Sequence, residues 1–194
     1  MQRPPHREEM AAALECERRA LEAMLAGDRD ASIKAFAETA THYRASWDTA
    51  PPGSYGRLIG MLKASILAGD AESAAEFAEA ALANDTAATP TAAYVRALAA
   101  LVAGRDVQAR TAAAQMVGGS PAFDRTAAAI VAIADRDGDA YVSAVGAIVA
   151  DFEQRPRHLT GVAVADTAAM LQALAAERGI SAQIESELLP NTGG

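Results

Sequence analysis

The chain has 194 residues, of which 51 are alanine and only 5% are aromatic, and its formal net charge is −8. This composition excludes a β-sandwich or β-barrel, because strands need Val, Ile, Thr and aromatic side chains, and it favours an all-α fold, because alanine is the best helix former. The acidic charge disfavours binding to a nucleic-acid backbone, which needs clustered cations, and is compatible with a cationic protein partner.

The start of the chain is charged and has no apolar segment behind it, so no signal peptide is expected. No apolar run further along approaches the roughly 18–20 residues that a membrane span needs. The single cysteine, Cys16, cannot form an internal disulfide, which fits a reducing compartment. The sequence therefore predicts a cytoplasmic protein that does not associate with membranes.

Nine helices are predicted from the spacing of apolar residues and from boundary signals. Helical segments repeatedly end in a glycine that an aspartate follows, as at Gly27-Asp28 and Gly69-Asp70. The glycine can close one helix in the left-handed conformation, and the aspartate can cap the next. Ser120-Pro121 is a further start signal, with a cap followed by proline at the first helical position. The predicted helices cover residues 7–26, 29–46, 55–68, 71–84, 91–103, 106–117, 121–136, 139–154 and 163–178.

The glycines Gly69, Gly104 and Gly138 that punctuate these segments are about 35 residues apart, which is the period of tetratricopeptide (TPR) repeats. The best copy covers residues 69–82, with small residues at the close-packing positions. We therefore expect stacked antiparallel helical hairpins, arranged as a TPR-like α-solenoid or as a bundle of about nine helices. Such hairpins can form a peptide-binding groove, or they can stack only to bury their apolar faces.

One domain is expected over residues 1–190, with residues 191–194 as a disordered tail. The segment 47–54 contains Pro51-Pro52-Gly53, so it is predicted to be a long loop within this domain. Residues 181–189 alternate weakly between polar and apolar and are predicted to form a short extended segment.

No catalytic, metal-binding or cofactor-binding constellation is recognisable, so an enzyme is not expected. The histidines His6, His42 and His158 are too scattered for a zinc site. The acidic run 135–141 resembles the opening of a calcium loop but has neither the glycine nor the glutamate that such a loop requires.

Trp47 and Tyr55 flank the proline-rich loop. Tryptophan and tyrosine are frequent in binding hot spots, so the two residues could contact a partner. The alternative is that both rings pin the loop onto the helical core.

A second candidate contact site is the connector before the last helix, where Arg155, Arg157 and His158 gather positive charge in an acidic chain. These side chains could contact a partner. Alternatively, they stabilise the carbonyl end of the preceding helix and pair with nearby acids. Asp166, in the first turn of the last helix, is expected to have a structural role.

The C-terminal segment resembles the immunity protein 49 family, whose members are all-helical bacterial proteins of polymorphic toxin systems. The resemblance is carried by His158-Leu159-Thr160-Gly161, by Asp166-Thr167 and by Leu188-Leu189-Pro190. It implies a protein without chemistry of its own that binds and neutralises a cognate toxin. The acidic charge would suit a basic toxin domain.

Two other functions stay open. One is a TPR-like adaptor that binds a peptide or protein without inhibiting it, and a homodimer through an alanine-rich face is also possible. The other is an enzyme or small-molecule binder, which would need a polar pocket lined by Arg155, Arg157, His158 and Asp166.

Overall fold

The computed structural model describes residues 4–189, and within this range the protein is all-α, with nine helices and no strand. Pro190, which is part of the family resemblance, and the predicted disordered tail 191–194 lie outside the described residues. Every predicted helix is present, and the observed bounds differ from the predicted ones by no more than three residues. The helices are α1 (Pro5–Leu25), α2 (Arg29–Asp48), α3 (Gly56–Ala68), α4 (Glu72–Leu82), α5 (Pro90–Val102), α6 (Asp106–Ala114), α7 (Pro121–Asp135), α8 (Gly138–Glu153) and α9 (Asp166–Ala176).

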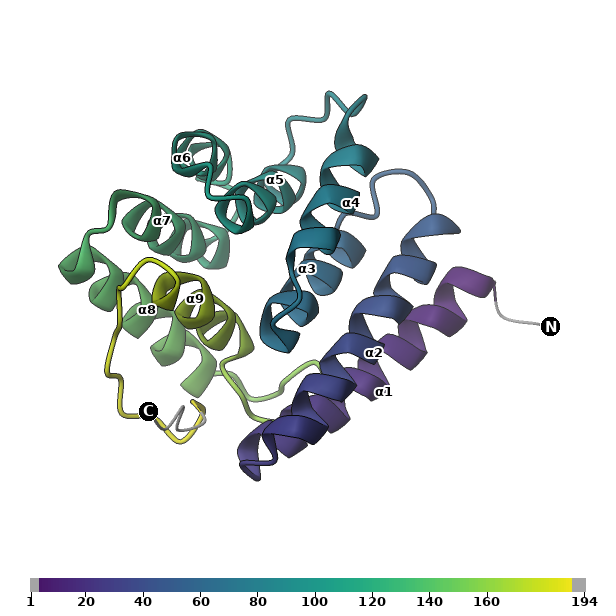
Figure 1. The fold of residues 1–194 in the computed structure, drawn as a ribbon, viewed down its shortest axis with the longest axis horizontal. Helices are drawn as coiled ribbons and strands as arrows, with labels where there is room; N and C mark the ends of the chain where they lie inside the picture. Colours follow the sequence, from purple (N-terminus) through teal and green to yellow (C-terminus); the bar gives the residue numbers. More distant parts are fainter. Residues whose placement is uncertain (1–3, 190–194) are drawn as a thin grey trace.

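Consecutive helices pack as antiparallel pairs, as the repeat spacing predicts (Figure 1). The odd-numbered helices also contact one another: α3 packs against α5, α5 against α7, and α7 against α9. This row of odd-numbered helices closes on itself, because α9 also packs against α3. The helices from α3 to α9 therefore form a closed arrangement, with the α1–α2 hairpin packed beside it.

Helix starts follow the predicted capping chemistry in part. Asp28 and Ser120 accept hydrogen bonds from the backbone N–H of Ala31 and Phe123, so they cap α2 and α7 as expected. The prediction fails at α4, where Asp70 lies outside the helix and Ala71 takes the cap position without a side-chain bond.

The turn between α7 and α8 also differs from the predicted pattern. Arg136, and not Gly138, takes the left-handed conformation after α7, with φ of 55°. Asp137 then caps α8 by accepting from the N–H of Ala140. Gly138 is already the first residue of that helix.

The core is built mainly from alanine, leucine and isoleucine, and α5 lies at its centre. Nine of the 13 residues of α5 are buried, as expected for a helix that is surrounded by others. A smaller apolar cluster joins the tip of the α1–α2 hairpin to the connector before α9, where Val164 packs with Leu21 and Phe36.

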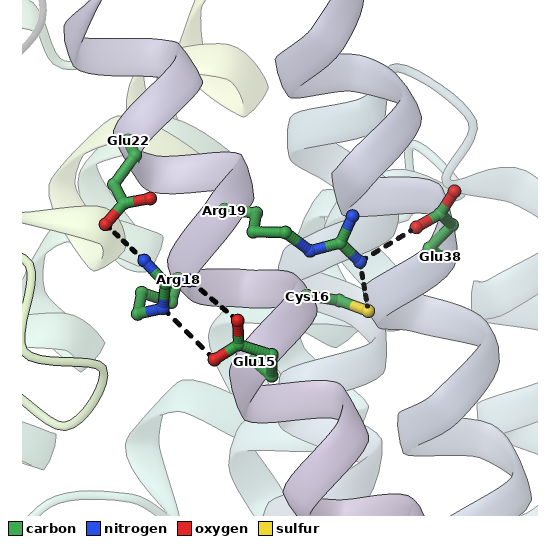
Figure 2. Close-up of polar contacts among 6 residues, drawn as sticks. All are labelled: Glu15, Cys16, Arg18, Arg19, Glu22 and Glu38. Carbon is green, nitrogen blue, oxygen red and sulfur yellow. Dashed lines mark hydrogen bonds and ion pairs between the residues drawn. The ribbon is translucent and has the colours of Figure 1, made fainter.

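The N-terminal hairpin is also held by polar contacts on its exposed side (Figure 2). Arg19 of α1 reaches Glu38 of α2, with 3.1 Å between the nitrogen and the oxygen, and the same guanidinium donates to the Sγ of Cys16 at 3.0 Å. Arg18, on a different side of α1, pairs with Glu15 and Glu22. The cysteine therefore faces an arginine, and the Arg19–Glu38 pair joins α1 to α2, whereas both partners of Arg18 lie on α1 itself.

Residues 181–189, predicted as a short extended segment, have no regular secondary structure up to 186 and end in a turn. They lie along α9 as an irregular segment, with Leu189 buried. The N–H of Ala165 donates to the carbonyl oxygen of Leu188 at 2.8 Å, and Gln172 donates to that of Ala182 at 3.3 Å. The segment forms no ladder, because it lies beside helices whose backbone groups are already paired.

Candidate partner-binding surfaces

Trp47 and Tyr55, the aromatic pair of the first candidate site, contact each other across the loop between α2 and α3. Their ring centroids are 6.1 Å apart, and the ring planes are tilted by 32°. Tyr55 is only 7% exposed, whereas Trp47 is half-buried. This geometry favours the pinning interpretation for Tyr55, because a ring inside the core offers no surface to a partner.

The hydroxyl of Tyr55 also holds the loop between α4 and α5. It donates to a carboxylate oxygen of Asp85 at 2.5 Å, and this bond lowers the pKa of Asp85 together with the N–H of Ala87. Arg96 donates to the carbonyl oxygens of Asp85 and Ala87 at 2.6 and 3.1 Å. Two neighbouring loops are thus fixed by one polar network.

In the connector site, Arg155 continues the end of α8. Its guanidinium lies 3.7 Å from the ring centroid of Phe152 and donates twice to one carboxylate oxygen of Asp151. Arg125 of α7 also bonds Asp151, at 2.5 Å. The hydrogen bond from Arg155, and the charges of Arg155 and Arg125, lower the pKa of Asp151. Arg155 therefore pairs with an acid, as the structural alternative predicts.

His158 packs on the same aromatic ring, with its ring centroid 6.1 Å from that of Phe152. The structure thus brings Arg155 and His158 together on one side chain. Arg157 is exposed between them, and the next side chain, Leu159, is 78% exposed. Three residues further on, Val162 packs against the small apolar cluster that contains Val164. The connector therefore has an exposed tip and a buried end.

The two candidate sites do not combine into one surface. Trp47 lies near the end of α2, whereas the connector packs against the start of α2, and the two segments are well separated in Figure 1. Asp166 does not join the connector cations either, because it faces Lys63 of α3.

Asp166 belongs to a buried ionic cluster that sequence reasoning did not find. Lys63 lies 2.5 Å from Asp166 and 2.7 Å from Glu17 of α1, measured from the lysine nitrogen to the carboxylate oxygens. Tyr43 of α2 donates to the other oxygen of Glu17 at 2.9 Å. Glu17 is 1% exposed and Lys63 15%, so the cluster is shielded from water. The sequence holds a signal for this cluster, because Lys63 stands among the apolar residues Met61, Leu62, Ala64 and Ile66.

The electrostatics of the cluster favour a protonated lysine. Burial alone would lower the pKa of Lys63, but the carboxylates of Asp166 and Glu17 outweigh it and raise this pKa above the ordinary value. Burial and the charge of Glu17 raise the pKa of Tyr43. The lysine is thus held protonated between two acids, which fits a structural tie. Residues 4–189 contain no cluster of His, Cys, Asp and Glu that could hold a metal ion.

The protein is all-α with sequentially paired helices, and its predicted contact residues lie on loops except for Trp47, which is in the last turn of α2. No protein-family model, curated protein or solved structure matches the chain. None of the described helices has the length and apolar character of a membrane span.

Proposed function

We propose that this protein binds a cognate bacterial toxin and neutralises it by direct protein–protein contact. The resemblance of the C-terminal segment to the immunity protein 49 family suggests that the binding partner is a toxin. The single observation that carries the binding role is the exposed tip of the connector, where Leu159 is 78% exposed beside Arg157.

The tip is suited to recognition because it is presented by a fixed scaffold. Leu159 lies between the stacked His158 and the packed Val162, so the chain is held on both sides of it. Binding residues are commonly found on loops that a rigid framework positions. An apolar side chain beside an arginine can also fill a partner pocket while the cation pairs at the rim.

A basic toxin domain would suit the rest of the surface, since the chain carries a net charge of −8. Opposite charge accelerates encounter over distances of about 10 Å at 0.1 M salt. Association with such a toxin should therefore slow steeply as the salt concentration rises, and a salt-independent association rate would contradict the electrostatic part of the proposal.

The test is a growth assay in which the product of the adjacent reading frame is expressed with and without this protein. We expect toxicity that wild-type protein relieves. A variant with Arg157→Glu and Leu159→Ser should lose this protection. The matched control is Val107→Ser, which changes a 66% exposed apolar residue on α6 and should protect like wild type. A product that is harmless, or that stays lethal in the presence of wild-type protein, would contradict the cognate pair.

The second candidate function is a TPR-like adaptor that binds a protein without inhibiting it. The sequential antiparallel pairing of the helices favours it. The closed contact between α3 and α9 counts against an open peptide groove along the odd-numbered helices. An adaptor would give no protection from any toxin, so the growth assay separates the two functions.

A further inference from the structure

A groove on the surface between α6, α7 and α8 is not used by either candidate site. It has a volume of about 480 Å³ and follows one face of α7, from Asp124 to Asp135. Ala127, Ala128 and Val131 form much of its floor, and Val117, which is 64% exposed, stands at its edge. Sites for ligands in proteins have volumes of about 300–1,000 Å³, so the groove is large enough for several apolar side chains.

The charged side chains that line this groove are all aspartates. Asp124 lies in the first turn of α7, Asp135 ends the helix, and Asp137 caps α8. Each carboxylate also has a partner within the protein: the N–H of Gly118, Arg110, and the N–H of Ala140, respectively. Arg110 neutralises Asp135, but Asp124 and Asp137 are exposed and accept only from backbone N–H groups, so the rim keeps a negative charge at both ends of the apolar floor.

We infer that this groove binds an amphipathic helix of a basic protein partner, with large aliphatic side chains on one face and a lysine or arginine near each end. A floor of alanines leaves space that only larger side chains from a ligand can fill, and a helix in an apolar groove is a common mode of peptide recognition. Asp124 and Asp135 are separated by three turns of α7, about 16 Å at 1.5 Å per residue. The cations of the ligand helix must therefore also lie about three turns apart.

The charge of the groove argues for this occupant over a second copy of the chain. Each copy carries a net charge of −8, so a second copy would bring like charge to an acidic rim. A nucleic acid is repelled for the same reason. The groove selects a docked segment by its chemistry alone, so the partner need not be a toxin.

The probe is a fluorescein-labelled synthetic helix with leucines spaced three and four residues apart on one face and lysines in its first and last turns. Its comparison peptide carries glutamates in place of the lysines. Binding is measured by fluorescence anisotropy, and the bound surface is mapped by amide chemical shifts. Ala128→Arg fills the groove with a cation, and Ala37→Arg makes the same change at an exposed alanine of α2 as the matched control.

We expect the basic peptide to bind wild type and Ala37→Arg equally, and to bind Ala128→Arg at least about tenfold more weakly, a loss of about 1.4 kcal/mol. Shifts should concentrate on α6, α7 and α8. The double variant Asp124→Asn, Asp135→Asn keeps the groove open and should weaken binding at low salt. No binding of the basic peptide, equal binding to all variants, or equal binding of the glutamate peptide would each overturn the inference.

Discussion

Lys63 and Asp166 are 103 residues apart in the chain, and the lysine Nζ donates to the aspartate Oδ2 at 2.5 Å. This contact joins α3 to α9, the two helices whose packing closes the row of odd-numbered helices. Glu17 of α1 approaches the same ammonium at 2.7 Å. One cation thus ties the first, third and last helices together, which gives the closed arrangement a specific register.

Asp166→Ala should destabilise the protein, because it removes one of the two carboxylates that pair with the buried Lys63. Because Lys63 keeps Glu17 as a partner, the expected loss is about 1–3 kcal/mol, measured as the free energy of unfolding in urea. The control Arg105→Gln removes the exposed pair between Arg105 and Glu79, whose side chains are both 41% exposed, and should change stability by less than about 1 kcal/mol. A loss for Asp166→Ala as small as that of the control, or an effect on partner affinity larger than on stability, would overturn the structural role.

Two buried tyrosines should respond in opposite directions when their hydroxyl is removed. Tyr43→Phe takes a donor from the buried carboxylate of Glu17 and should lower the free energy of unfolding by about 1–3 kcal/mol. The hydroxyl of Tyr141 is buried, and no group among residues 4–189 bonds it. Tyr141→Phe removes that unpaired group and should leave stability unchanged or raise it by about 1 kcal/mol. Equal losses in both variants would show that the two hydroxyls are equivalent.

Local sequence signals were enough to predict the helices. Their starts and ends depend on neighbours a few residues away, such as Asp28 with Ala31, and on apolar spacing within one helix. The partners of Lys63 could not be predicted in this way, because they come from α1 and α9. The sequence likewise does not show that Tyr55 is a core residue and not a partner-contact residue, because its hydrogen-bond partner Asp85 is 30 positions away. The groove along α7 could not be predicted from the sequence either, because it is formed by the way α6 and α8 pack beside α7.

The bond from Tyr55 to Asp85 predicts a pH dependence on the acid side. The bond lowers the pKa of Asp85 below the ordinary 3.8, so the folded state stays ionised where the unfolded chain is already protonated. The resulting stabilisation is present above the unfolded pKa and is lost as the pH falls through the folded pKa. In Tyr55→Phe the pKa of Asp85 should return towards 3.8. The difference in Tm between wild type and Tyr55→Phe should therefore be constant from about pH 7 to pH 5 and shrink below about pH 4.

Ser54→Ala is the control for this pH dependence. The Ser54 hydroxyl donates to the carbonyl oxygen of Pro51 at 2.7 Å in the same loop, and neither group titrates in this range. Its Tm difference from wild type should be the same at every pH. A Tyr55→Phe difference that is equally flat down to pH values below about 3 would mean that the hydroxyl does not stabilise the ionised form of Asp85.

Two glycines inside helices should respond oppositely to alanine. A Cβ on Gly60 of α3 would lie 2.6–2.8 Å from three ring atoms of Tyr43, the residue that bonds Glu17. Since the ring cannot withdraw without breaking that bond, Gly60→Ala should lower the free energy of unfolding by about 1–3 kcal/mol. A Cβ on Gly146, in the middle of α8, would meet no atom of another described element within 4 Å, so Gly146→Ala should raise stability by up to about 1 kcal/mol through helix propensity.

The double variant Gly60→Ala, Tyr43→Leu identifies the cause of the loss at position 60. Its loss in the free energy of unfolding should be smaller than the sum of the two single losses, because the smaller leucine side chain leaves room for the Cβ. Strict additivity would mean that the Tyr43 ring is not what excludes a side chain at position 60.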